Sequence, residues 1–277
     1  MATETVERPR DDLAVRPGGL RLPRVRGWEA VVAVVGGLVL WQLAVEIFEP
    51  NPLTVVGPIE VVESGRSLAE QGLLWNDVSV SVEQFFIGFA YALVLGVTVG
   101  VLLGASPRAS RFLSPWLMIL YTVPVIALAP LIIIWFGIGD TAKVVIVATS
   151  AFFPIAINTK VGVAGTDRAL IDLTTVFGAT RVERLRTVLV PNAVPYILAG
   201  VRLGIGRGLV GLVFGDLFGA TAGLGYLILR SQQNLQTANV FVGVVVIGLL
   251  GLLLGGGVSL LERRWARYRP SIQGART

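Results

Sequence analysis

The sequence predicts an all-α integral membrane protein with six transmembrane helices and both termini in the cytoplasm. Composition is the first of three observations behind this prediction, since hydrophobic residues make up 54% of the chain and charged residues only 15%. Soluble domains carry roughly one quarter charged residues, and the mean hydropathy of this chain is +0.75. Most of the chain is therefore expected to lie in a lipid bilayer.

Six long apolar runs are the second observation. Each is close to the roughly 20 residues that a helix needs to cross the hydrocarbon core of a membrane. The predicted spans are residues 30–48, 85–105, 116–137, 144–163, 195–218 and 240–261. An even number of spans returns the chain to its starting side, so both termini are expected on one side of the membrane.

The uneven distribution of basic residues is the third observation. Six arginines precede Trp28, and further basic residues lie in the loops 106–114 and 160–194 and after residue 262. The other side carries far fewer: Arg66, Lys143 and Arg230. Loops rich in Lys and Arg remain in the cytoplasm, which predicts that both termini lie there. This orientation accounts for the net charge of +5 without a nucleic-acid partner.

The membrane domain is predicted to occupy residues 28–269, between cytoplasmic tails at 1–27 and 270–277. The first tail mixes Arg, Asp, Glu, Pro and Gly without apolar periodicity, which is typical of disordered segments. It is too long and too acidic for a secretory signal. Between the first two spans, spaced apolar residues from Ile59 to Leu74 predict either a short amphipathic helix on the outer surface or a packed connector.

Missing residue types exclude several enzyme classes. The chain contains no Cys and no His, which excludes thiolate and imidazole metal sites, Cys nucleophiles and Ser-His-Asp triads. A nucleotide-binding phosphate loop needs Gly-Lys-Ser/Thr, whereas the two lysines, Lys143 and Lys160, follow Ala142 and Thr159. The chain is therefore not expected to be an enzyme or to hold a metal or cofactor of its own.

Prolines interrupt two of the predicted spans. Pro124 and Pro130 lie in the span 116–137, and Pro154 lies in the span 144–163. Proline removes a backbone donor and displaces a carbonyl, and in lipid these groups must be satisfied by neighbouring protein or by a water-filled cavity. The two helices are therefore candidates to line a pathway, with simple packing kinks as the alternative.

Polar and charged residues within the spans are further pathway candidates. Thr122, Ser150 and Asn158 could contact a solute, but each could equally form a helix–helix hydrogen bond. Arg207 and Asp216 lie in the fifth predicted span, where a charged group usually faces a cavity or a partner. One hypothesis is that Arg207 lends positive potential to a pathway for an anionic solute. The alternative is that Arg207 pairs with a carboxylate or with backbone carbonyls.

The loop of residues 164–194, between the fourth and fifth spans, has the pattern of two short helices. Leu170, Leu173 and Phe177 fall at i, i+3 and i+7 on one helical face, and Gly178 is placed to end that helix in the left-handed region. A helix of about ten residues is marginal alone in water. This helix must therefore pack against the spans or against another subunit.

The second loop helix is predicted to begin with a capping box. Thr180 precedes Glu183 by three residues, which allows reciprocal hydrogen bonds at a helix start. An apolar stripe then follows, formed by Val182, Leu185 and Leu189. Pro191 is expected to end this helix, because proline cannot donate the backbone hydrogen bond that a helix interior needs.

The loop resembles the EAA loop of ABC-importer permeases. That family pattern reads E-A-A, three residues, G, nine residues, I-x-L-P. The matching residues here have the same spacing and are Asp172-Leu173-Thr174, Gly178 and Val188-Leu189-Val190-Pro191. Leu173 and Thr174 replace the two alanines, whereas the glycine and the proline are retained. Residues 124–131, 135–139, 152–155, 158–159 and 222–226 are similar to the subgroup that imports nitrate, sulfonates and taurine.

The resemblance implies a type I ABC importer permease fold in the cytoplasmic (inner) membrane. It implies a pathway formed with a second permease subunit as a homodimer, and an extracytoplasmic solute-binding protein that delivers a small solute. It also implies two cytoplasmic ATP-binding subunits, which hold ATP and Mg and each receive a coupling helix at about residues 168–178. The residues implied in coupling are Asp172, Leu173, Thr174, Phe177, Gly178, Thr180, Val188 and Pro191.

Two alternatives follow from the residues alone. A secondary transporter or channel could use six spans and broken helices, with Asp216 as an ion or proton site. Such a protein would need no ATPase, and its halves would often show repeats, which are not evident in this sequence. A membrane scaffold without transport is the other alternative, and it would leave the proline-broken spans without a purpose.

Overall fold

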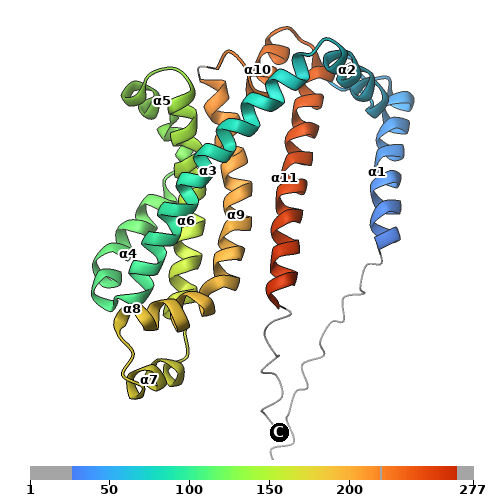
Figure 1. Cartoon of the computed structure of the whole chain (residues 1–277). Coiled ribbons are helices and arrows are strands. Elements are labelled where there is room, and N and C mark those ends of the chain that lie inside the picture. The colour runs from blue at the N-terminus through green and yellow to red at the C-terminus, as the bar shows by residue number, and fades with distance from the viewer. Residues whose placement is uncertain (1–26, 219, 267–277) are drawn as a thin grey trace, which may run out of the picture.

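The computed structural model describes residues 27–218 and 220–266, so the predicted tails fall outside it except for Gly27. All regular structure in this part of the chain is helical, as predicted (Figure 1). The elements are α1 Gly27–Phe48, α2 Pro58–Glu70, α3 Leu73–Ala105, α4 Pro107–Thr122, α5 Val125–Phe136, α6 Asp140–Ala164, α7 Arg168–Val176, α8 Arg181–Arg184, a π-helical turn Leu185–Leu189, α9 Val190–Leu217, α10 Leu224–Gln233 and α11 Thr237–Ala266.

Five helical stretches of the described chain are long and apolar enough to cross a membrane. They belong to α1, α3, α6, the stretch from α8 through α9, and α11. The pair α4 and α5 is a sixth candidate, although these two helices meet at 96°. The structure thus confirms a multi-pass, all-α membrane protein with five or six spanning helices.

The sixth candidate is a broken helix and not the continuous span predicted for residues 116–137. α4 ends at Thr122, and Val123 adopts an extended conformation with φ −69° and ψ 124°. The ring of Pro124 disfavours the helical conformation for the residue before it, and Pro124 itself has no amide hydrogen to donate. The chain therefore turns at Pro124 before α5 begins.

Helix α6 lies at the centre of the bundle, between α3 and α9. It has the largest buried share of the five spanning candidates, whereas α1 and α11 have the smallest. Glycines allow the helices to approach closely. At Gly100 of α3 there is no room for a larger residue, because an added Cβ would lie 2.5 Å from the Cβ of Thr159. A Cβ at Gly211 of α9 would lie 2.5 Å from the Oγ of Ser150. Such close backbone approach is the usual way that membrane helices pack tightly.

The connector between α1 and α3 forms α2, which lies at the same end of the bundle as α10 (Figure 1). Its buried residues are Val61 and Leu68, which pack in one cluster with Leu224 and Leu227 of α10 and with α11. Ile59 and its neighbour Val62 are exposed. The packed connector is therefore the better description of this segment than a helix lying on the membrane surface.

Helices α7 and α8 lie at the opposite end of the bundle. Figure 1 shows α7 projecting below the spans, at the end where α1 begins and α11 ends. The described ends of α1 and α11 therefore lie toward one side of the bundle, the side that carries α7.

Candidate functional site

Helix α7 is short and is capped at both ends by local hydrogen bonds. The Oδ1 of Asp167 accepts a hydrogen bond from the amide of Ala169 at 2.9 Å, which caps the N-terminus. At the other end Gly178 has φ +70°, and the amide of Ala179 donates to the carbonyl of Thr174 at 2.9 Å. The predicted helix and its left-handed glycine are both confirmed.

The side chains of α7 present an apolar surface to solvent. Leu170 and Leu173 are about half exposed, and Val176 and Phe177 are more than four-fifths exposed. Val176, which the sequence pattern had not singled out, extends the predicted face. Apolar side chains gathered on a projecting helix are typical of a surface that another protein covers. We call Leu170, Leu173, Val176 and Phe177 the apolar face of α7.

Helix α7 is tied to α8 by one arginine that the sequence analysis did not identify. The guanidinium of Arg184 donates from Nε to the Oγ1 of Thr174 and from Nη2 to the Oγ1 of Thr175, both at 3.0 Å. The predicted capping box is present, since the Thr180 amide donates to Glu183 Oε2 at 2.7 Å and the Glu183 amide donates to Thr180 Oγ1 at 3.3 Å. The loop is therefore a connected unit.

The second loop helix does not end at Pro191, contrary to the sequence prediction. α8 continues through the π-helical turn Leu185–Leu189 into α9, so the chain is helical from Arg181 to Leu217. Pro191 cannot donate to a carbonyl one turn back, and the Val190 amide bonds instead to the Leu185 carbonyl five residues earlier. The wider turn lies just before the proline, and the chain stays helical from the loop helix into α9, although Figure 1 shows the stretch changing direction between α8 and α9.

A cavity of about 330 Å³ lies at the break between α4 and α5, against α6 and α9. Four of the predicted pathway residues line it: Thr122, Pro124, Ser150 and Arg207. The hydroxyls of Thr122 and Ser150 donate to carbonyls of their own helices, Ile119 at 2.7 Å and Ile146 at 2.8 Å. Among the described residues, neither hydroxyl forms the helix–helix hydrogen bond that the alternative required.

Arg207 is exposed on the side of α9 that lines this cavity. Within the described residues it makes no ion pair and no hydrogen bond, so the proposed pairing with a carboxylate or carbonyl is not seen. Arg202 differs, because its guanidinium pairs with Glu262 and donates to Ser259 on α11. One of the two arginines in the fifth span therefore holds helices together, whereas the other presents a free charge to the cavity.

The remaining predicted pathway residues lie elsewhere. Pro130 is exposed on α5, and Pro154 is buried within α6. The Nδ2 of Asn158 donates to the Pro154 carbonyl at 2.8 Å, and Asn158 packs against Gly200 of α9. Pro154 and Asn158 shape α6 and its contact with α9, and none of these three residues lines the cavity.

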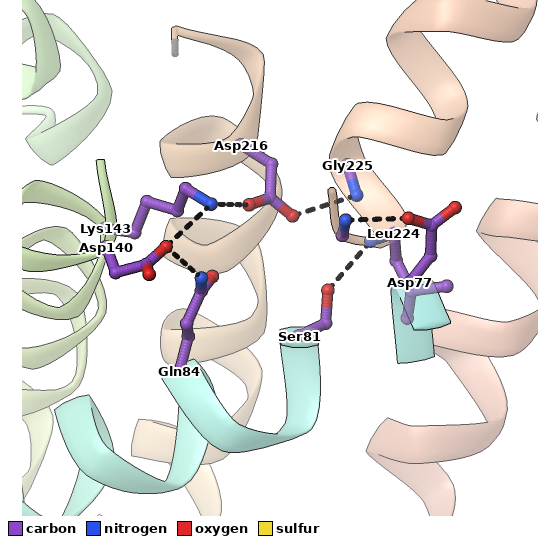
Figure 2. Close-up of polar contacts among 9 residues, drawn as sticks. Asp77, Ser81, Gln84, Asp140, Lys143, Asp216, Leu224 and Gly225 are labelled. Carbon is purple, nitrogen blue, oxygen red and sulfur yellow. Dashed lines mark hydrogen bonds and ion pairs between the residues drawn. The ribbon is translucent and has the colours of Figure 1, made fainter. Parts of the chain in front are cut away.

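Asp216 belongs to a buried polar network at the α10 end of the bundle (Figure 2). Its carboxylate is fully buried, with Oδ1 3.6 Å from Lys143 Nζ and Oδ2 accepting from the Gly225 amide at 3.1 Å. Lys143 also lies 3.3 Å from Asp140, which accepts from Gln84 of α3 at 2.7 Å. The network connects α3, α6, α9 and the start of α10.

Two further residues of α3 hold the turn that leads into α10. Asp77 Oδ1 accepts from the Gly223 amide at 2.9 Å, and Ser81 Oγ accepts from the Leu224 amide at 2.8 Å. Figure 2 shows both side chains pointing to the same turn as Asp216. The sequence signal for this network is the set of polar residues spaced four and three apart along an otherwise apolar α3, at Asp77, Ser81 and Gln84.

Comparison with known proteins agrees with this arrangement. Residues 92–267 match the family model described as "Binding-protein-dependent transport system inner membrane component". The protein SsuC of Bacillus subtilis (strain 168), whose name assigns it to aliphatic sulfonates transport, is 32% identical over 94% of this chain and 93% of its own length. The taurine transport system permease protein TauC of Escherichia coli (strain K12) is 32% identical over 85% of this chain and 88% of its own length.

The fold also has a counterpart among solved structures. An inward-facing structure of the MetNI methionine ABC transporter superposes with a TM-score of 0.63 at 23% identity, covering 70% of this chain and 96% of that one. The likeness shows the type I ABC importer permease fold. The chain therefore belongs to the family of binding-protein-dependent transport system inner membrane components, the multi-pass permease subunits of ABC importers.

Proposed function

We propose that α7 is the coupling helix through which ATP-binding subunits drive this permease. The observation that carries the proposal is the apolar face of α7, exposed on a helix that projects from the bundle. An apolar surface of this kind fits a groove on a partner protein, in the manner of other helix-in-groove contacts. Leu173 and Phe177 of this face are among the coupling residues implied by the family pattern, which are Asp172, Leu173, Thr174, Phe177, Gly178, Thr180, Val188 and Pro191.

The path of force runs from α7 through Arg184 into α8 and along α9. Because α8 and α9 form one helical stretch, a displacement of α7 moves the fifth span directly. ATP binding draws the two ATP-binding subunits together, and the attached spans rock between outward-open and inward-open arrangements. The cavity at the α4–α5 break then becomes accessible from each side in turn.

The partners are a second copy of this chain, two ATP-binding subunits that hold ATP and Mg, and an extracytoplasmic solute-binding protein. The α7 end of the bundle faces the cytoplasm, so both termini lie on that side. Basic residues at this end support the orientation, because Arg-rich segments remain in the cytoplasm. They include Arg108, Arg111, Arg181, Arg184, Arg186, Arg263 and Arg264.

The transported solute is a small organic anion of the sulfonate class. The free guanidinium of Arg207 supports this assignment, because it can donate to two oxygens of a sulfonate at once. The cavity of about 330 Å³ is at the lower end of the range for small-ligand pockets. The name of SsuC refers to aliphatic sulfonates, and the name of TauC refers to taurine, which is itself a sulfonate.

Reconstitution tests this function. Vesicles that hold the permease with its ATP-binding subunits and binding protein are expected to accumulate an aliphatic sulfonate when ATP is supplied on the α7 side. Vesicles that hold the permease alone are expected to accumulate none. Uphill uptake by the permease alone would refute the coupling proposal.

A further inference from the structure

A second cavity, of about 610 Å³, lies at the α7 end of the bundle, where the start of α4 faces α8. Two pairs of arginines line it, each pair spaced i and i+3 so that both side chains share one helical face. Arg108 and Arg111 come from α4, and Arg181 and Arg184 come from α8. We call these four residues the arginine cluster.

The positive charge of the arginine cluster is not neutralised within the described chain. None of its four guanidiniums lies in an ion pair there, and the cavity has no acidic lining residue. Glu183, the nearest carboxylate in sequence, accepts hydrogen bonds from Thr180 instead. Arg184 uses two of its five donors on Thr174 and Thr175, which leaves donors free. Four like charges around one cavity favour an anionic occupant.

The surroundings of the cavity indicate that the anion comes from the membrane. Three apolar side chains of the α8 segment, Val182, Leu185 and Leu189, line the cavity beside the arginines, and Ala105, Ser106 and Pro107 complete the lining. On α4, Phe112 directly follows Arg111 and Trp116 lies one turn further on, and their side chains are 78% and 64% exposed. Aromatic side chains beside basic ones mark the level of the lipid headgroups at the end of a membrane span. An occupant with a charged head and apolar chains fits this combination better than a fully polar ion.

We propose that the arginine cluster binds the phosphate headgroup of an acidic phospholipid from the cytoplasmic leaflet. This proposal rests on the proposed function, which places the arginine cluster on the cytoplasmic side and makes α8 part of the coupling path. The bound headgroup bridges α4 and α8, and α8 is the element that links α7 to the fifth span. An acidic lipid would therefore fix the position of α8, and efficient ATP-driven uptake would depend on such a lipid.

Lipid binding is tested on the purified full-length permease by titration with phosphatidylglycerol, read out by native mass spectrometry. The Arg108→Gln/Arg111→Gln variant is expected to bind about thirtyfold more weakly, since each arginine near acidic lipid contributes a factor of about five to six. The matched control is Arg186→Gln/Arg264→Gln, which removes two exposed charges from the same end of the bundle. Equal loss in both variants, or no loss in the first, would overturn the proposal.

The functional arm compares complete transporters in vesicles of pure phosphatidylcholine and in vesicles with about one quarter phosphatidylglycerol. Uptake is expected to be faster in the mixed vesicles, and the Arg108→Gln/Arg111→Gln variant is expected to lose this gain. Uptake that is measurable but equal in both vesicles overturns the lipid proposal alone. Absence of uptake in every vesicle counts instead against the proposed function, and the titration still decides on lipid binding.

Two other occupants give distinct results. Millimolar inorganic phosphate added to phosphatidylcholine vesicles is expected to leave uptake unchanged, and a gain equal to that from phosphatidylglycerol would identify a soluble anion and overturn the lipid assignment. The Arg108→Gln/Arg111→Gln variant is expected to retain its ATP-binding subunits in detergent. Loss of those subunits would show that the cavity receives acidic side chains of that partner instead, which also overturns the proposal.

Discussion

The Nε of Arg184 lies 3.0 Å from the Oγ1 of Thr174, which joins the projecting helix α7 to the continuous helical stretch of α8 and α9. We expect Thr174→Val to keep the shape of this contact and to remove its acceptor. A hydrogen bond to a charged group contributes about 1.5–3 kcal/mol, so the link should loosen. The expected result is fewer solute molecules imported per ATP hydrolysed, with the ATP-binding subunits still attached.

Thr187 offers the control for that experiment. Its hydroxyl donates to the Glu183 carbonyl one turn earlier at 2.7 Å and, within the described residues, makes no hydrogen bond to α7. Thr187→Val should therefore preserve the number of solute molecules imported per ATP hydrolysed. A Thr174→Val transporter with the parental ratio would contradict the assigned path of force.

The apolar face of α7 should control association with the ATP-binding subunits. Phe177 is 84% exposed, so Phe177→Ala removes little from the core of the permease and should not lower its amount in the membrane. Co-purification of the ATP-binding subunits should fall clearly, because truncation of a buried aromatic anchor at an interface costs about 2 kcal/mol or more. Ile138→Ala is a suitable comparison, since Ile138 is 78% exposed but lies outside the loop. Equal co-purification of both variants would argue against α7 as the docking helix.

Gly178 should tolerate substitution only by residues that accept its backbone conformation. A Cβ at Gly178 would meet no atom within 4 Å, so any defect must come from its φ of +70°. A β-branched residue in this region costs on the order of 1–3 kcal/mol, whereas Asn enters it more readily. We expect Gly178→Val to abolish uptake with normal membrane insertion, and Gly178→Asn to retain part of it. If both variants transport equally, the turn has no role in coupling.

Arg207→Gln should slow the uptake of an anionic sulfonate, because it removes the unpaired charge on the cavity wall. Arg207→Lys keeps the charge but loses the forked donors, so an intermediate rate is expected. The assay is initial uptake by the complete transporter at several sulfonate concentrations. Parental rates for Arg207→Gln would remove this arginine from the transport pathway.

Asp216 and Lys143 should behave as a buried ion pair whose members depend on each other. Removing one partner leaves an uncompensated buried charge, and a loss of about 3–5 kcal/mol is typical. Lys143→Met and Asp216→Asn should each lower the melting temperature of the detergent-purified permease. The double variant should lose less than the sum of the two single variants. Strictly additive losses would show that the 3.6 Å contact is not an energetic pair.

Features set by neighbouring residues in the chain were predictable from the sequence. The left-handed Gly178 and the capping box of Thr180 and Glu183 depend on hydrogen bonds that span only a few residues. The spanning helices were predictable because the bilayer requires long apolar runs. The permease family and its ABC-importer function followed from dispersed motifs and are confirmed by the comparisons, which disfavour a secondary transporter, a channel or a scaffold.

Features that depend on tertiary contacts or on alternative helical geometry were missed. Pro191 was expected to end a helix, but a π-helical turn bypasses its missing donor. Residues 116–137 were predicted as one span, although the chain bends by 96° between α4 and α5 at Pro124. The burial of Asp216 against Lys143 brings together residues far apart in sequence, and no local pattern encodes that pairing.

The glycine contacts at the centre of the bundle restrict how the molecule can deform. At Gly100 and Gly211 there is no room for a Cβ, so a rotation or slide of α3 or α9 that brought a larger residue to either point would make it clash with α6. These three helices must therefore travel as a single body during a transport cycle. The conformational change of each cycle is therefore expected at the bend at Pro124 and in the outer helices α1 and α11, which have the smallest buried share.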